Sequence, residues 1–237
     1  MQQQSTRSLR FQVPVPLPRA AVVGRKFDYS FCTPRPRGAC ASRSSTNPSG
    51  GPGGDYRFEA RASLPAGLRL DPLSGLLLGI VRRNVKPGAH RFSVCVTTTA
   101  QPVSGKRPEV CLNTSVLVVA DFSGVWDGTF SADEGQSSCA SSARGNATLT
   151  LRQQGASLSG RFAYRVTSSA PNPGAAPSCV QLPAAGTIPL TAMVSRNTLK
   201  GSGFSLTRSG STLSGTFFGM VQGIELAAEI SAARLSG

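Results

Sequence analysis

Apolar and polar side chains alternate with a period of two along much of this 237-residue chain. In residues 56–62, for example, Tyr56, Phe58 and Ala60 alternate with charged side chains. This period places one set of side chains on each face of a β-strand and is incompatible with an amphipathic helix. The chain also has 26 glycines and 17 prolines, which separate the alternating segments as tight turns do. We therefore expect an all-β protein with little helix.

In the first half of the chain, the alternation predicts a series of strands. Residues 33–54 are rich in Pro, Gly and Ser and predict a long surface loop, and residues 1–10 predict a flexible N-terminus. Residues 90–97 and 109–119 are expected to form a hairpin. The remaining expected strands are 11–17, confined to a sheet edge by its prolines, and 27–32, 56–62 and 76–80.

Three segments carry a resemblance to a known family. They are residues 56–60, YRFEA, residues 64–79, LPAGLRLDPLSGLLLG, and residues 88–94, GAHRFSV. Together they resemble the immunoglobulin (cadherin-like) domains of microbial surface proteins, in which the pattern LPxGLxLdxxtGxlxGtP is followed by GxyxFxVxV. The resemblance implies a β-sandwich over residues 11–120. The chain departs from the pattern at residues 80–83, IVRR, where the family usually has Thr-Pro. Asp71 begins a turn that ends at Gly75, and one carboxylate is too few for a calcium site.

The second half begins near residues 120–124 and contains an internal repeat. Residues 151–162 align with residues 206–217, 55 positions later, and residues 197–201 are a partial third copy. Each copy reads as strand, tight turn and strand, so we expect an up-and-down meander of six to eight strands, ending with residues 223–230, that closes into a barrel.

A Gly-x-Trp motif at residues 124–126 opens this meander. With the repeat, it makes residues 121–237 resemble the calycin barrels of the lipocalin and avidin type. The resemblance implies a small antiparallel barrel with Trp126, Phe162 and Phe217 in its interior. Biotin binding is not implied, because avidin-type pockets have several tryptophans and Trp126 is the only one here. Trp126 can pack the barrel base or contact a ligand, and the first reading is favoured.

Six cysteines and a single histidine make disulfides a better interpretation than a zinc site. Reduced thiols in a cytosolic protein are the alternative. Strand parity places Cys95 and Cys111 on the same outer face of the expected hairpin, nearly equidistant from its turn, which predicts that they are bonded. The simplest pairing of the others joins Cys32 to Cys40 and Cys139 to Cys179, out of the 15 pairings that six cysteines allow.

The net charge of +14 is concentrated in the first half. Residues 1–120 contain 17 Lys and Arg against 5 Asp and Glu, whereas residues 121–237 contain 8 against 6. Most of the cations are arginines, which bind carboxylate, phosphate and sulfate groups through several hydrogen bonds. An anionic partner and simple solubility are both open explanations. The candidate contacts are Arg35, Arg37 and Arg43 in the 33–54 loop and Arg82, Arg83 and Lys86 in a turn.

Patterns of known catalytic sites are missing from the sequence. His90, the only histidine, stands where the family pattern has an aromatic residue, and there is no G-x-S-x-G, P-loop or G-x-G-x-x-G motif. The adjacent Asp133 and Glu134 would point to opposite faces of a strand. We therefore expect a protein that is not an enzyme and has no cofactor or metal.

Three functions fit these observations. The first is an extracellular or cell-surface binding or assembly module that contacts a glycan, a cell-wall polymer or an acidic protein. The others are a carrier of a small apolar ligand in the barrel and a structural subunit of a larger assembly. No apolar run reaches the length of a membrane span, and no aromatic platform accompanies the arginines as in nucleic-acid binding. The polar start MQQQSTR is not a signal peptide, so export implies a signal absent from this sequence or a non-standard route.

Overall fold

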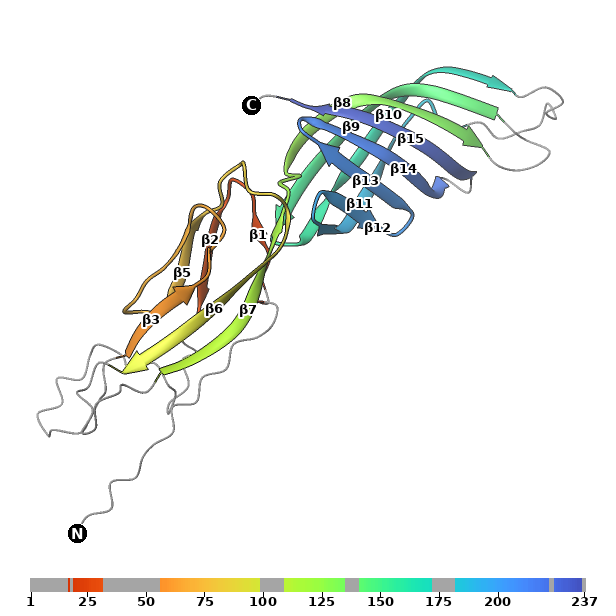
Figure 1. The fold of residues 1–237 in the computed structure, drawn as a ribbon. Helices are drawn as coiled ribbons and strands as arrows, with labels where there is room; N and C mark the ends of the chain where they lie inside the picture. Colours follow the sequence, from red (N-terminus) through yellow and green to blue (C-terminus); the bar gives the residue numbers. More distant parts are fainter. Residues whose placement is uncertain are drawn as a thin grey trace, which may run out of the picture. The chain divides into compact units, whose positions relative to one another are not determined.

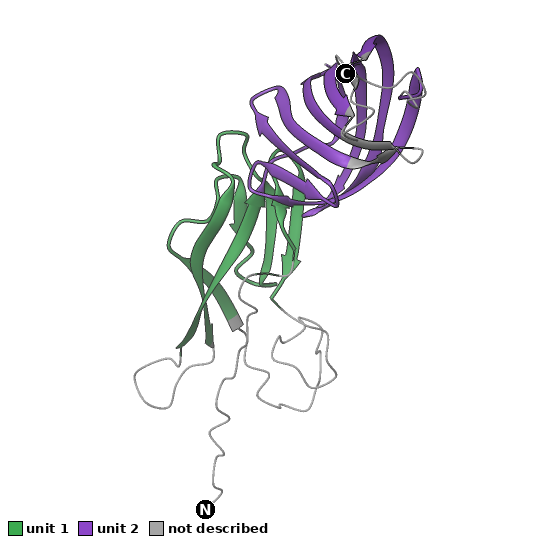
Figure 2. Cartoon of the chain, turned by 90° about the vertical axis from the view of Figure 1, so that its right-hand side faces the viewer, with its two compact units in different colours: residues 1–118 green, residues 119–237 purple. Residues whose placement is uncertain are grey.

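The computed structural model describes residues 17, 19–31, 56–98, 109–134, 141–171, 182–221 and 224–235. These residues form 15 strands and no helix, which confirms the all-β prediction (Figure 1). The chain divides into two compact units, residues 1–118 and 119–237, drawn in green and purple in Figure 2. The expected boundary segment, residues 120–124, begins one residue after the start of the second unit at Val119.

The described residues of unit 1 form seven strands in two sheets (Figure 1). One is a curled four-stranded sheet with the order β1-β7-β6-β3, and the other is a small sheet with the order β2-β5-β4. The expected hairpin is present as β6 and β7, which pair antiparallel over their length. The strands are β1 (Ala21–Val22), β2 (Lys26–Ser30), β3 (Tyr56–Arg61), β4 (Leu68–Leu70), β5 (Leu76–Ile80), β6 (Gly88–Thr98) and β7 (Glu109–Val119).

The two sheets of unit 1 bury one shared core. The alternation in the sequence explains this core. In β3, β6 and β7 the apolar residues stand at every second position, so their side chains all point to the same face of the sheet. The rings of Phe31, which follows β2, and Phe92 of β6 meet edge to face with centroids 6.5 Å apart. The buried members of this core are Leu17, Ala21, Phe27, Phe31, Phe58, Leu68, Leu77, Val81, Phe92, Val94, Val96, Val116 and Val118.

The turn between β4 and β5 is held by the Asp71 side chain. Its Oδ1 accepts hydrogen bonds from the backbone N–H of Leu73, at 2.9 Å, and of Ser74, at 3.2 Å. Gly75 has φ +66°, and a Cβ atom there would lie 2.9 Å from the Phe58 ring. Glycine is thus required at position 75 for two reasons, the backbone conformation and the lack of space for a side chain. The hydrogen bonds from Leu73 and Ser74 hold the pKa of Asp71 below its usual value.

This turn predicts a pH-dependent contribution to stability. Because the pKa of Asp71 is lower in the folded chain, its stabilisation is present above the unfolded pKa of about 4 and is lost as the pH falls through the folded value. We expect wild type to be more stable than Asp71→Ala at pH 7 and the difference to shrink towards pH 2. Urea unfolding midpoints at both pH values measure this, and a difference independent of pH would contradict it.

Unit 2 is a closed antiparallel barrel of eight strands, with β15 pairing back to β8 (Figure 2). Strands adjacent in sequence are adjacent in the barrel, as in an up-and-down meander. Closure leaves no sheet edge unpaired in the barrel. The strands are β8 (Gly124–Glu134), β9 (Ser141–Gln154), β10 (Ser157–Pro171), β11 (Ala185–Ser195), β12 (Thr198–Gly201), β13 (Phe204–Ser209), β14 (Thr212–Val221) and β15 (Ile224–Arg234).

The sequence repeat corresponds to two structurally equivalent hairpins. Its first copy spans the β9–β10 hairpin and its second copy spans the β13–β14 hairpin. The turn glycines, Gly155 and Gly210, both have φ +61°, which explains why glycine recurs at this position of the repeat. The partial third copy, residues 197–201, includes all of β12, which pairs with β11 across another tight turn. The prediction of successive hairpins is therefore confirmed.

Candidate functional site

Five exposed cations gather at one end of unit 1, where two turns lie side by side. Arg25 lies in the turn between β1 and β2, and Lys26 is the first residue of β2. Arg82, Arg83 and Lys86 belong to the turn between β5 and β6. All five side chains are exposed, and neither turn segment, 23–26 or 82–86, contains a carboxylate. We call these five residues the cationic end.

Backbone hydrogen bonds bring the two turns of the cationic end together. The Gly24 N–H donates to the Val81 carbonyl at 2.8 Å, and Lys26 of β2 lies opposite Ile80 of β5. The Arg82 N–H donates to the Ala66 carbonyl at 2.9 Å, which ties the second turn to the segment before β4. The positions of these cations therefore follow from main-chain pairing.

The second turn is also closed within itself. The Val85 N–H donates to the Arg82 carbonyl at 3.1 Å, and the Nε2 atom of His90 lies 2.9 Å from the Lys86 carbonyl oxygen. His90 thus contacts the backbone of the turn that carries three of the predicted cations. This contact favours a structural role for His90.

Sequence reasoning found only part of this cluster. Arg82, Arg83 and Lys86 were candidate contacts and lie together, whereas Arg25 and Lys26 were missed because they are more than 50 residues away in sequence. A cationic pair immediately after Gly24 in a turn was the available signal. The remaining predicted contacts, Arg35, Arg37 and Arg43, and the 33–54 loop that carries them lie outside the described residues.

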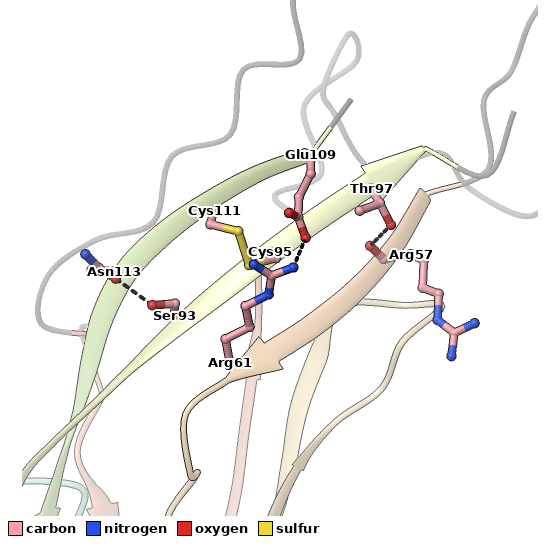
Figure 3. Close-up of a disulfide and its surroundings, with 8 residues drawn as sticks. All are labelled: Arg57, Arg61, Ser93, Cys95, Thr97, Glu109, Cys111 and Asn113. Carbon is pink, nitrogen blue, oxygen red and sulfur yellow. Dashed lines mark hydrogen bonds and ion pairs between the residues drawn. A yellow bond between two sulfur atoms is a disulfide. The ribbon is translucent and has the colours of Figure 1, made fainter. Parts of the chain in front are cut away.

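The disulfide joins Cys95 of β6 to Cys111 of β7, as strand parity predicts (Figure 3). Both cysteines point to the outer face of the curled sheet, but Cys95 is only 1% exposed. The outer face expected for Cys95 therefore does not expose its side chain, because Cys95 stands on a central strand between Glu59 of β3 and its disulfide partner Cys111 of β7. The ion pair of Arg61 and Glu109, 2.6 Å long, lies beside the disulfide in Figure 3.

The disulfide also shows that one cluster of potential metal ligands is not a metal site. The ligand atoms of Cys95, Cys111 and Glu109 lie within 4.8 Å of one another. Since both sulfurs are bonded to each other, neither is a thiolate that could bind a metal. The other four cysteines, Cys32, Cys40, Cys139 and Cys179, lie outside the described residues, and so do their predicted pairings.

Trp126 lies in the interior of the barrel near the end that carries the tight turns. Its side chain is fully buried, and its Nε1–H donates to the Phe122 carbonyl at 2.9 Å. The guanidinium groups of Arg208 and Arg234 lie over the indole, 5.6 and 5.7 Å from a ring centroid. This arrangement favours the packing interpretation of Trp126.

A polar network surrounds these two arginines. Arg234 forms an ion pair of 3.1 Å with Asp121 and donates to the Ser123 carbonyl, and Arg208 donates to the Asp121 carbonyl. Sequence reasoning missed both arginines. They stand near strand ends, 82 and 108 residues after Trp126, and nothing in the sequence pattern indicates that they contact it.

Aromatic rings fill the barrel interior beyond Trp126. Phe162 and Phe217, the other predicted interior residues, are buried and stack with centroids 6.1 Å apart. A Cβ atom at Gly186 would lie 2.6 Å from the Tyr164 ring, so the space that glycine leaves is occupied by that ring. The Tyr164 hydroxyl is buried and has no hydrogen-bond partner among the residues that the structure describes, and burial raises the pKa of this residue.

Comparison of the chain with family models, with curated proteins and with solved structures finds no match. Within the described part of the chain, no helix has the length and apolar character needed to cross a membrane.

Proposed function

We propose that this chain is a non-enzymatic binding or assembly module of the extracellular space or cell surface, and that the cationic end of unit 1 contacts an anionic partner. The partner is a glycan, a cell-wall polymer or an acidic protein face. In this proposal unit 1 is an immunoglobulin/cadherin-like sandwich and unit 2 is a calycin-like barrel. The shared core of the two sheets and the closed eight-stranded meander support these assignments.

The observation that carries the proposal is the convergence of the two cationic turns. Five exposed cations from separate parts of the sequence meet on one surface, and the turn segments 23–26 and 82–86 contain no carboxylate. Such a cluster attracts anions over the range of the Debye length, and its arginines can bind oxyanions through paired N–H groups. Location outside the cytosol is supported by the Cys95–Cys111 disulfide.

The two alternatives have less support. A carrier needs space in the barrel, and among the described interior residues aromatic rings occupy positions such as the space beside Gly186. A structural subunit needs a continuous apolar patch, whereas exposed apolar residues such as Leu73, Met193 and Phe218 belong to different elements.

The proposal predicts a salt-dependent interaction that maps to the cationic end. The triple variant Arg82→Ser/Arg83→Ser/Lys86→Ser should bind immobilised anionic polymers at least about tenfold more weakly than wild type, because three of five cations are lost. Heparin, polyphosphate and polygalacturonate present sulfate, phosphate and carboxylate groups. Biosensor titrations at rising NaCl should show that wild-type affinity falls as the Debye length shrinks to about 3 Å at 1 M salt.

A matched control separates a specific surface from net charge. The variant Arg152→Ser/Arg161→Ser/Arg165→Ser removes three exposed arginines of unit 2 and leaves the cationic end intact. It should keep most of the wild-type affinity. Equal losses in the two triple variants, or binding that does not respond to salt, would refute a role for the cationic end.

A further inference from the structure

An open groove crosses the outer face of the barrel over β14, β15, β8 and β9 and reaches Thr167 of β10. Its volume is ≈ 650 Å³, within the range typical of ligand sites. Hydroxyl-bearing side chains predominate among the residues that line it, for example Thr129, Ser131 and Thr216. Two charged side chains, Arg144 and Glu229, complete its polar lining.

Strand register explains how the groove is built. Thr216, Glu229, Ser131 and Arg144 lie opposite one another in turn, forming one row across the four strands. The short Ser131 side chain separates the two long charged ones and leaves a hollow between them. A parallel row of small polar side chains lies two residues along each strand, and it consists of Ser214, Ser231, Thr129 and Asn146.

The two charges of the groove are available for a ligand. Arg144 and Glu229 are exposed, and neither forms an ion pair with another described residue. Their backbones are two strands apart, about 10 Å, with Ser131 between them. One cation and one anion also leave the groove without net charge, in contrast to the cationic end.

We propose that this groove binds a neutral oligosaccharide. Sugar hydroxyls both donate and accept hydrogen bonds, and Ser and Thr hydroxyls can match either role. The carboxylate of Glu229, the guanidinium of Arg144 and the amide of Asn146 are planar groups that can each contact two neighbouring sugar hydroxyls. A row across four strands spans about 14 Å, which suits a short chain of linked sugar rings.

An exposed aromatic ring extends this surface. Phe218 is 57% exposed and is the next outward-facing residue after Thr216 on β14. Its ring can stack on the apolar C–H face of a sugar, which would otherwise stay in water. The combination of hydroxyls, paired planar groups and one ring favours a saccharide over two other ligands. An apolar molecule would leave the polar groups unpaired, and a peptide strand would find no free edge on a closed barrel.

The experiment uses the whole chain on an array of neutral and charged oligosaccharides, followed by calorimetric titration of the neutral tetrasaccharides that bind best. Arg144→Gln, Glu229→Gln and Phe218→Ala should each weaken binding of the best tetrasaccharide at least about tenfold, and Ser131→Phe, which fills the hollow, should abolish it. Near-ultraviolet circular dichroism of the buried Trp126 verifies that each variant is folded.

Controls on another part of the barrel make the result specific. Arg161→Gln on β10 and Met193→Ala on β11 remove an exposed arginine and a side chain that is 58% exposed, and both should bind the sugar as wild type does. Absence of binding to every neutral glycan at about 10 mM, or equal losses in groove and control variants, would overturn the proposal. It does not depend on the cationic end, so the Arg82→Ser/Arg83→Ser/Lys86→Ser variant should bind the neutral sugar normally.

Discussion

Replacing Trp126 with alanine is expected to lower the free energy of unfolding of unit 2 by about 3 to 5 kcal/mol. The indole is fully buried in the barrel. Its removal leaves a cavity and deprives the Phe122 carbonyl of its donor. It also removes the ring over which Arg208 and Arg234 lie. A loss of this size is a large share of the stability of an ordinary domain.

Differential scanning calorimetry is the suitable measurement, because it reports on both units and does not use the fluorescence of the tryptophan that is removed. Phe218→Ala, which truncates an exposed ring of the same barrel, should change the stability by no more than about 0.5 kcal/mol. Trp126→Phe should fall between the two, since it keeps a ring but loses the Nε1–H donor. A Trp126→Ala variant that melts with the wild-type profile would show that the indole is not a core residue.

The second large effect is expected in unit 1 when its described disulfide is removed. Cys95 and Cys111 are 16 residues apart in sequence, and the chain-entropy estimate for a closed loop of this size is about 3 kcal/mol. The double variant Cys95→Ala/Cys111→Ala should be destabilised by about this amount, because its unfolded chain has more conformations. The β6–β7 pairing itself has ten matched residue pairs and should survive.

Urea unfolding followed by far-ultraviolet circular dichroism measures the change, and amide hydrogen exchange of β6 and β7 shows whether the hairpin opens more often. The double variant is preferable to adding a reductant, which acts on all six cysteines. Neutralising the neighbouring ion pair by Glu109→Gln is the comparison, since an exposed pair contributes no more than about 1 kcal/mol. An unchanged midpoint in the double variant would mean that the bond does not constrain the unfolded chain.

Much of the fold could be predicted because strand assignment is local. The alternation in residues 109–119 predicts β7 with both of its ends, and the repeat of residues 151–162 and 206–217 predicts two hairpins with glycine in the turn. Parity also placed Cys95 opposite Cys111, since two strands joined by one turn have few possible registers. Each of these inferences needed only neighbouring residues or a single turn.

The candidate sites were predicted less completely because they join residues that are distant in sequence. Arg25 and Lys26 reach Arg82 only through the pairing of β2 with β5. The groove was not predicted at all, because its row joins the first two strands of the barrel, β8 and β9, to the last two, β14 and β15. Glu229 and Ser131, for example, meet only where β15 closes the barrel on β8.

The sequence by itself determined which side chains share a face of each strand, because the backbone of an extended chain turns every second residue the same way. It also determined where the chain reverses, since glycine at positions such as 75, 155 and 210 accepts the positive φ of a turn. Only the tertiary structure decided which strands are neighbours, and therefore which cations converge and which polar side chains line the groove. Strand order is set by the burial of whole sheets and the closure of the barrel, which no local pattern contains.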